Sequence, residues 1–325
     1  MTAAGSLDGL MTAPGEIPAS APARAPRAGR SAGIAIGLAS ALCFGTSGTF
    51  GAALIGAGWS PVGAVLARVT VAALALTVPA LIALRGRWVL LRRSAGQVIA
   101  YGLVGVAACQ VCYFNAIALM PVGVALLLEY LGVVLIVGWL WLRHGQRPTP
   151  LTVVGGIAAL GGLALMLNLS GAGGVSLVGV IWALLAAVAM AVYFIQSANG
   201  ADALPPVVLT WGGMVIGAAA LAVVGGTGLM PLRASAADVD LLGHRVSVLV
   251  PVLGLSLVAA AAAYVLGIGA ARRLGPKLGS FVGMAEIAFA VLFAWVLLRQ
   301  APTVTQFLGG ALIVAGVIAV RLDEP

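Results

Sequence analysis

The sequence predicts an all-α polytopic membrane protein with ten transmembrane helices as two inverted five-helix repeats. Three observations carry this prediction. The composition is too apolar for a water-facing shell, the chain divides into ten apolar runs of about spanning length, and the last two runs of each half match one another at a fixed offset of 154 residues.

The composition excludes most soluble classes. Of the 325 residues, 62% are hydrophobic and 8% are charged, whereas a soluble domain carries about 25% charged residues. The mean hydropathy is +1.14, and the chain lacks the alternating polar segments of an outer-membrane barrel. A pI near 10.3 would indicate nucleic-acid binding in a soluble protein. Here the basic residues are placed as the topology of a membrane protein requires, which accounts for the high pI. We therefore expect no nucleic-acid partner.

The N-terminal segment, residues 1–31, is rich in Ala, Pro, Gly and Ser and has no apolar periodicity. We therefore expect a disordered cytoplasmic tail. The first long apolar run begins at Gly33 and is long enough to span a bilayer, unlike the short core of a secretory signal, so we expect no cleavage.

The remaining chain divides into ten runs of about 20 mostly apolar residues, the length that a spanning helix needs. Met120 and Pro121 alone separate the third run from the fourth, and the proline favours a hairpin over one long helix. The predicted spans are 33–54, 61–84, 98–120, 122–142, 152–169, 175–199, 206–226, 247–270, 278–298 and 303–322.

The orientation follows from the basic residues, because translocation of Lys and Arg is disfavoured. With a cytoplasmic N-terminus, thirteen of the 17 basic residues fall inside and three fall outside, and Arg68 lies within a span. We therefore expect a multi-pass protein of the bacterial cell (inner) membrane with both termini cytoplasmic. The inside residues are Arg24, Arg27, Arg30, Arg85, Arg87, Arg92, Arg93, Arg143, Arg147, Arg272, Arg273, Lys277 and Arg321; the outside ones are Arg233, Arg245 and Arg299.

The internal repeat divides the chain into a first half, 32–170, and a second half, 171–325, which includes a short C-terminal tail. Because five helices are an odd number, the two halves enter the membrane from opposite sides. Such inverted repeats place a binding site near the midplane between the halves and indicate alternating access. The residues that coincide at the offset of 154 are Trp141, Gln146, Pro148, Thr149, Gly155, Gly156 and Gly162 with Trp295, Gln300, Pro302, Thr303, Gly309, Gly310 and Gly316.

Two hairpins carry a family resemblance: LLLEYLGVVLIVGWLWLRHGQRPTPLTVVGG at 126–156 and SFVGMAEIAFAVLFAWVLLRQAPTVTQFLGGALIVAGV at 280–317. With these segments the chain resembles the EamA group of the drug/metabolite transporter superfamily, nearest to its amino-acid exporter-like members. The resemblance implies ten helices, cytoplasmic termini and movement of small metabolites, often export of amino acids or related compounds. Where the family commonly has Gly-Glu before the last helix of each half, this chain has neutral Gln146 and Gln300.

Three charged residues lie within the predicted spans: Arg68, Glu129 and Glu286. A charge at this depth costs at least about 2.5 to 3.5 kcal/mol on insertion scales and is normally held in a cavity or by a partner. At 1.5 Å per residue, Arg68 and Glu129 both lie about 10 Å below the outer surface, which allows an ion pair, and Glu286 lies about 13 Å above the inner surface. We interpret the carboxyl groups as sites that bind and release protons or bind substrate amines. The alternative is a structural Arg68–Glu129 pair with a protonated, hydrogen-bonded Glu286.

Polar residues of the third span extend this candidate site. The amides of Gln110 and Asn115 can hydrogen-bond both ends of a zwitterion, and Tyr113 lies between them in sequence. Hydrogen bonding between helices explains these residues equally well. Weaker candidates are Thr46, Ser47, Thr49, Tyr193, Gln196 and Tyr264.

Other functions have weaker support. Cys109 and Cys112 form a CxxC, but a redox pair needs a helix N-terminus or a cation beside it, and these cysteines lie deep in an apolar run. The two histidines fall in loops on opposite sides, which disfavours a zinc hydrolase. We predict a secondary transporter that is not an enzyme, with a small-molecule substrate, the lipid bilayer and protons as its partners and with no cofactor or metal. A channel or a membrane receptor is the main alternative, and a membrane thiol oxidoreductase is a weaker one.

Overall fold

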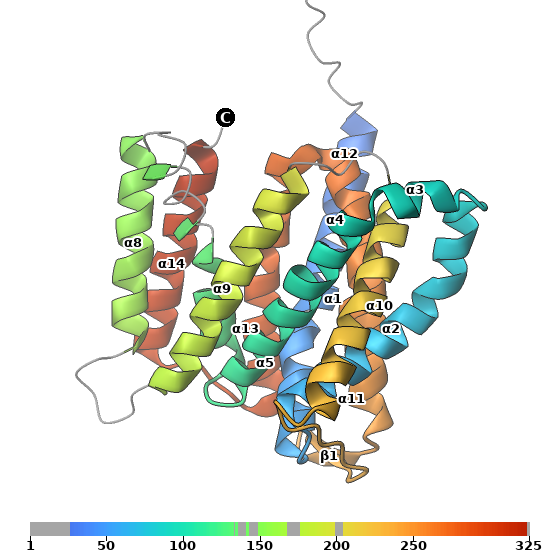
Figure 1. The fold of residues 1–325 in the computed structure, drawn as a ribbon. Helices are drawn as coiled ribbons and strands as arrows, with labels where there is room; N and C mark the ends of the chain where they lie inside the picture. The colour runs from blue at the N-terminus through green and yellow to red at the C-terminus, as the bar shows by residue number, and fades with distance from the viewer. Residues whose placement is uncertain are drawn as a thin grey trace, which may run out of the picture.

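The computed structural model describes residues 27–323, apart from residues 133, 136–140, 143–148, 168–175 and 199–203. In these residues the chain is a bundle of helices with one short hairpin at its lower end (Figure 1). The helices and strands are α1 (Arg27–Gly56), α2 (Pro61–Leu84), α3 (Trp88–Arg93), α4 (Ala95–Ala100), η1 (Tyr101–Ala108), α5 (Cys109–Ile117), α6 (Val122–Tyr130), α8 (Pro150–Leu167), α9 (Leu177–Ala198), α10 (Pro206–Gly226), β1 (Val239–Leu241), β2 (His244–Val246), α11 (Leu249–Leu253), η2 (Gly254–Ala262), α12 (Ala263–Gly283), α13 (Ala285–Leu298) and α14 (Val304–Asp323).

Five of the described helical segments are long and apolar enough to cross a bilayer, and four shorter apolar helices accompany them. The mostly helical membrane fold is therefore confirmed, while the count of ten spans stays a prediction. The five long segments are Ser31–Gly56, Pro61–Leu84, Ala95–Ile117, Val207–Gly226 and Leu249–Gly267; the shorter ones are Pro150–Leu165, Leu177–Val192, Ala285–Leu298 and Val304–Ala319.

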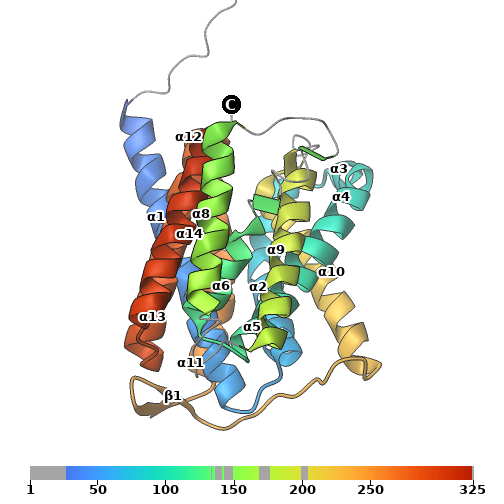
Figure 2. The same ribbon diagram turned by 90° about the vertical axis from the view of Figure 1, so that its left-hand side faces the viewer.

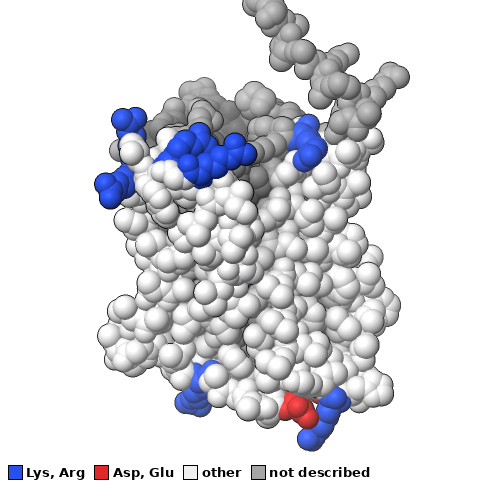
Figure 3. Space-filling model, turned by 90° about the vertical axis from the view of Figure 1, so that its right-hand side faces the viewer, with Lys and Arg blue, Asp and Glu red and all other residues white. Residues whose placement is uncertain are grey.

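On the face that Figure 3 shows, the surface charge lies at the two ends of the molecule. Figure 3 shows Lys and Arg at the upper end, a mixture of basic and acidic residues at the lower end, and an uncharged band between them. The described side chains at the upper end include Arg85, Arg87, Arg92 and Arg93, all exposed. A charge-free band flanked by charged ends is typical of a protein that crosses a bilayer.

Local sequence signals set several helix ends. Ser60 caps α2 by accepting a hydrogen bond from the Gly63 amide at 3.1 Å, and Pro61 follows it at a position where a missing N–H costs nothing. Pro121 separates α5 from α6, so the predicted hairpin there is confirmed. α1 begins at Arg27, earlier than the first predicted span, and the rest of the predicted tail, residues 1–26, lies outside the described residues.

The prediction of a break between the eighth and ninth spans is wrong. Residues 271–277 were expected to form a loop because they include Arg272, Arg273 and Lys277, but α12 continues through them to Gly283. Arg and Lys are good helix formers, so a helix that leaves the apolar layer has no reason to end at them. In Figure 1 α12 turns across the upper end of the molecule before α13 descends from Ala285.

Two π-helical segments occupy equivalent places in the two halves. η1 lies in the third predicted span and η2 in the eighth, and their last residues, Ala108 and Ala262, differ by the same 154 positions as the sequence repeat. A π turn is rare and is frequently found at functional sites. The shared irregularity supports the equivalence of the two halves beyond the hairpins in which the sequence match was found.

The last helices of the two halves, α8 and α14, stand side by side and antiparallel (Figures 1 and 2). A Cβ atom at Gly162 would lie 2.5 Å from the Gly309 carbonyl oxygen, and one at Gly316 would collide with the Gly155 carbonyl oxygen. These four glycines are the ones that the repeat relates to each other. Each of these two helices therefore supplies the same close contact to the other.

This packing predicts a contrast between neighbouring glycines. Gly162→Ala should lower the free energy of unfolding by about 1–3 kcal/mol because the methyl group meets backbone atoms of α14 that cannot move aside. Gly161→Ala is the matched control, since its nearest neighbour is a Leu312 methyl group at 3.8 Å, and it should gain up to about 1 kcal/mol from helix propensity. Thermal unfolding of the purified variants in detergent measures both. Equal midpoints for the two variants would contradict the packing.

Candidate functional site

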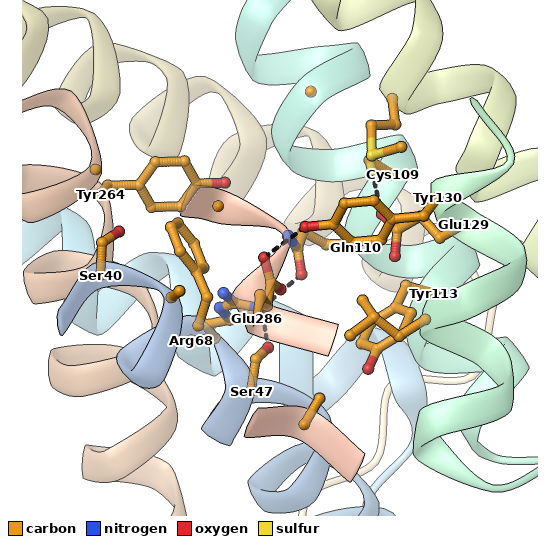
Figure 4. A pocket seen from close by; sticks show the side chains of 18 residues that line it. Ser40, Ser47, Arg68, Cys109, Gln110, Tyr113, Glu129, Tyr130, Tyr264 and Glu286 are labelled. Atoms are coloured by element: carbon orange, nitrogen blue, oxygen red, sulfur yellow. Dashed lines mark hydrogen bonds between the residues drawn. The ribbon is translucent and has the colours of Figure 1, made fainter. Parts of the chain in front are cut away.

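A cavity of about 370 Å³ lies between the two halves. Residues of α1, α2, η1, α5, α6 and α9 line it together with residues of α12 and α13. Five of the six predicted site residues are among them: Arg68, Gln110, Tyr113, Glu129 and Glu286 (Figure 4). Residues far apart in the sequence are thus brought to one place.

Arg68 is buried in the wall of this cavity, with 2% of its surface exposed. Its Nη1 donates hydrogen bonds to Ser47 Oγ at 2.8 Å and Gln110 Oε1 at 2.5 Å, and its Nη2 donates to the Ala259 carbonyl at 2.8 Å. The guanidinium lies 6.0 Å from the centre of the Phe114 ring. Because an arginine only donates, the Gln110 amide must face it with its oxygen.

The predicted ion pair between Arg68 and Glu129 does not form. In the part of the chain that the structure describes, Arg68 contacts neutral acceptors and no carboxylate lies at ion-pair distance. The depth estimate placed both residues at the same level, but the Glu129 carboxyl group accepts from Cys109, whereas the Arg68 guanidinium donates to Ser47, Gln110 and Ala259. The cavity therefore contains a cation whose charge no described carboxylate neutralises at contact, and a buried charge of this kind attracts an anionic group of a ligand.

The Ala259 carbonyl that accepts from Arg68 belongs to η2. In a π segment the backbone hydrogen bonds shift to the i→i+5 pattern, and carbonyls near the shift become available to other donors. The equivalent segment η1 contributes Gly105 to the cavity wall. Both irregular segments therefore border the cavity.

Glu129 is buried and accepts a hydrogen bond from the Cys109 thiol at 3.1 Å. Cys109 and Cys112 are both free thiols. The first cysteine of the CxxC is thus a hydrogen-bond donor to the carboxyl group, which accounts for a thiol at this position without redox chemistry.

Glu286 accepts a hydrogen bond from the Tyr130 hydroxyl at 3.1 Å. Tyr130 belongs to α6 of the first half and Glu286 to α13 of the second (Figure 4). The neighbours Glu129 and Tyr130 therefore reach different partners, one within its own half and one across the cavity.

Asn115 does not belong to the site. Its Nδ2 donates to the Val111 carbonyl at 2.8 Å, one helical turn earlier, and it is not among the cavity-lining residues. Of the weaker candidates, Ser47 and Tyr264 line the cavity, and the Tyr264 ring packs edge-on against Phe44 at 4.9 Å. Thr46 and Thr49 do not line it. The side chains of Tyr193 and Gln196 lie outside the described residues.

Sequence reasoning missed Tyr130 and Cys109. Tyr130 was not among the predicted site residues, although a tyrosine next to a membrane carboxyl is itself a signal. Cys109 was weighed only as a redox residue. Its position one residue before Gln110, on the helix that also carries Tyr113, could have indicated the cavity.

The cavity lies away from the end of the bundle that carries the α1–α2 turn. It is lined by residues 40–47 of α1 and by Arg68 of α2, whereas Leu54, Val62 and Val65 are nearer the turn and fully buried in apolar contacts. These buried apolar side chains lie between the cavity and the α1–α2 turn. The described residues also contain no cluster of three or more His, Cys, Asp or Glu side chains placed to hold a metal.

A solved crystal structure is similar to this chain, with a TM-score of 0.60 and 24% identity over 91% of this chain and 100% of the other, a likeness of fold alone. A comparison with curated proteins finds no match. The model of the EamA-like transporter family matches twice, over residues 31–168 and 177–322. Since the two matches cover most of the chain, one over each half, the protein belongs to the EamA-like transporter family, whose members carry small substrates across membranes.

Proposed function

We propose that this protein is a secondary transporter that exports an amino acid or a related zwitterionic metabolite by alternating access, coupled to protons. The observation that carries the proposal is the cavity between the halves, which combines the Arg68 guanidinium, with no described carboxylate at ion-pair distance, with the carboxyl groups of Glu129 and Glu286. Its volume of about 370 Å³ suits a small metabolite, since ligand pockets measure about 300–1,000 Å³.

A zwitterion matches the charges of this cavity. Its carboxylate can pair with the guanidinium of Arg68, and its ammonium group can pair with Glu286 or Glu129. The aromatic rings of Phe44 and Tyr264 supply an apolar wall beside these groups. Opposite charges at two places in one cavity favour a ligand that carries both over a simple cation.

Proton coupling follows from competition for the carboxyl groups. A protonated Glu286 that binds an ammonium group must release its proton, and it takes a proton up again after the substrate has left. If release occurs on the cytoplasmic side and uptake on the outer side, the proton moves inward as the substrate moves outward. The inward movement of protons would then drive export.

The proposed architecture has ten spans in two inverted halves, 32–170 and 171–325, with cytoplasmic termini in a bacterial inner membrane. The antiparallel glycine contacts of α8 and α14 support the inversion. The π segments at equivalent positions support the division into halves. The exposed arginines around α3 support the cytoplasmic assignment of that end.

The proton role predicts the behaviour of Glu286→Gln. In liposomes loaded with a transported amino acid, this variant should lose transport driven by a pH gradient, because its amide cannot exchange a proton. Counterflow without a gradient should persist at a reduced rate. Gradient-driven transport with unchanged pH dependence at normal expression would rule out the proton role. Ionic currents of channel size without substrate would instead favour a channel.

The carboxylate role of Arg68 predicts a selective loss. Arg68→Gln should raise the KM for an amino acid at least about tenfold, or about 1.4 kcal/mol, because the substrate carboxylate loses its charge-assisted partner. The amine obtained from that amino acid by decarboxylation lacks this contact and should be affected less. Counterflow measurements with the matched pair test this, and an equal loss for both compounds would indicate a purely structural arginine.

The proposed orientation predicts the accessibility of the two ends. Arg87 and Arg245 are exposed at opposite ends of the bundle, and the native cysteines are buried or half-buried. In intact cells a membrane-impermeant maleimide should label Arg245→Cys and leave Arg87→Cys unlabelled until the cells are opened. The reverse pattern would invert the proposed topology.

A further inference from the structure

The segment between α10 and α11, residues 227–248, crosses the lower end of the bundle and is here called the strap (Figure 2). It includes the hairpin of β1 and β2. The equivalent connection of the first half, residues 85–94 between α2 and α4, is less than half as long and lies at the other end. The long connection is therefore found only in the second half, at the lower end of the bundle.

The strap is fastened to the first half at the α1–α2 turn. Ser60 donates its amide and its hydroxyl to the Arg233 carbonyl at 3.1 and 3.4 Å, and accepts from the Arg233 amide at 2.9 Å. Trp59 Nε1 donates to the Ser235 carbonyl at 2.8 Å. Gly63 permits this approach, since a Cβ atom there would collide with the Arg233 carbonyl oxygen. These contacts form the α1–α2 clasp.

The strap is fastened to the second half at the end of α13. Leu242 and Gly243 form a two-residue hairpin turn with positive φ angles of 61° and 79°, and the Leu242 amide donates to the Leu297 carbonyl at 3.1 Å. The Arg299 guanidinium lies over Gly243, where a Cβ atom would be 2.6 Å from Nη2. This α13 clasp has one hydrogen bond, whereas the α1–α2 clasp has four.

Between its two clasps the strap packs against the apolar layer that lies between the cavity and the α1–α2 turn. Val239 and Leu241 of β1 are 2% and 6% exposed and pack into the same apolar core as Leu54, Val62 and Val65. The cavity lies beyond this layer, and α13 carries both Glu286 near its start and the clasp at its end. A displacement of α13 that opened the cavity toward the strap would have to break the α13 clasp.

We propose that the strap is a detachable latch: it closes the cavity on the strap side, and that side opens when the α13 clasp releases while the α1–α2 clasp stays bound. This inference rests on the proposed alternating access. The weaker clasp is the one that releases, because one backbone hydrogen bond and one exposed arginine hold it. The stronger clasp keeps the strap in place for reclosure.

Arg299→Gly tests the latch with a matched control. Arg299 and Arg85 are both helix C-caps with positive φ, 56° and 48°, so glycine relieves the same strain at both positions. Only Arg299→Gly removes a contact with the strap. The reporter is the native Cys109 in the cavity, labelled by a membrane-impermeant thiol reagent added on the strap side and identified by mass spectrometry.

We expect Arg299→Gly to raise the rate of Cys109 labelling at least about threefold, because the open state is reached by breaking the clasp, and Arg85→Gly to leave the rate unchanged. Equal rates in the wild type and both variants would overturn the latch. Labelling of Cys109 only from the opposite side, in every protein, would instead overturn alternating access and with it the proposed function.

Cross-linking identifies which clasp releases. A disulfide between Leu242→Cys and Leu297→Cys should reduce strap-side labelling at least about tenfold, as expected for a state made inaccessible, and reduction should restore it. The control is Gly58→Cys with Ser235→Cys, whose Cβ atoms would be 3.8 Å apart, within disulfide range. It should leave labelling unchanged. Equal inhibition by both cross-links would overturn the assignment of the α13 clasp.

Discussion

The buried guanidinium of Arg68 is the constraint around which the cavity is arranged. Removal of an arginine from water costs several kcal/mol, and hydrogen-bond acceptors at fixed positions in the protein must offset this desolvation cost. Ser47, Gln110 and Ala259 provide them from α1, α5 and η2. Because η2 belongs to the second half, one side chain ties both halves to the same point and leaves its net charge facing the cavity.

The contacts between the halves are of two kinds. α8 and α14 meet through glycines at backbone distance, an arrangement that resists sliding and separation. The halves also pack closely along α1 and α13, where a Cβ atom at Gly45 would lie 2.7 Å from Phe289 Cβ. Single polar contacts add to this packing, such as Tyr130 with Glu286 and the Val122 amide with Gln300 Oε1 at 3.1 Å. Each of these polar bonds is worth about 1 kcal/mol net. The two halves are therefore held together by close helix packing, with a few polar hydrogen bonds between them.

Much of the fold was predictable because lipid imposes strong rules on sequence. Prolines at 61, 121 and 206 mark helix starts, and the repeat of Gly155 and Gly162 at Gly309 and Gly316 identified α8 and α14 as equivalent helices, which the structure then shows packed together. The continuation of α12 through its basic residues was missed because polarity marks where a helix leaves the bilayer and carries no information on where the helix ends.

The residues that line the site were largely predictable, but their hydrogen-bond partners were not. The scarcity of charges in the spans selected Arg68, Glu129 and Glu286, and all three line one cavity. Their hydrogen-bond partners depend on the rotation of each helix about its axis, which depth estimates do not contain. Glu129 therefore faces Cys109 and not Arg68, and Asn115 turns back to its own helix. The strap was not predicted as a structural element, since its α1–α2 clasp joins residues more than 170 positions apart.

The π segments η1 and η2 give the third and eighth spans a mechanical property that straight helices lack. A π turn holds a surplus residue, and if that surplus migrates along the helix, the side chains it passes rotate by about 100° while both helix ends stay anchored. Cys109 and Gln110 directly follow η1, and Ala259 lies within η2. The hydrogen-bond partners of Glu129 and Arg68 thus lie in or next to the two π segments, where the side chains and carbonyls can rotate about the helix axis without unfolding of the helix.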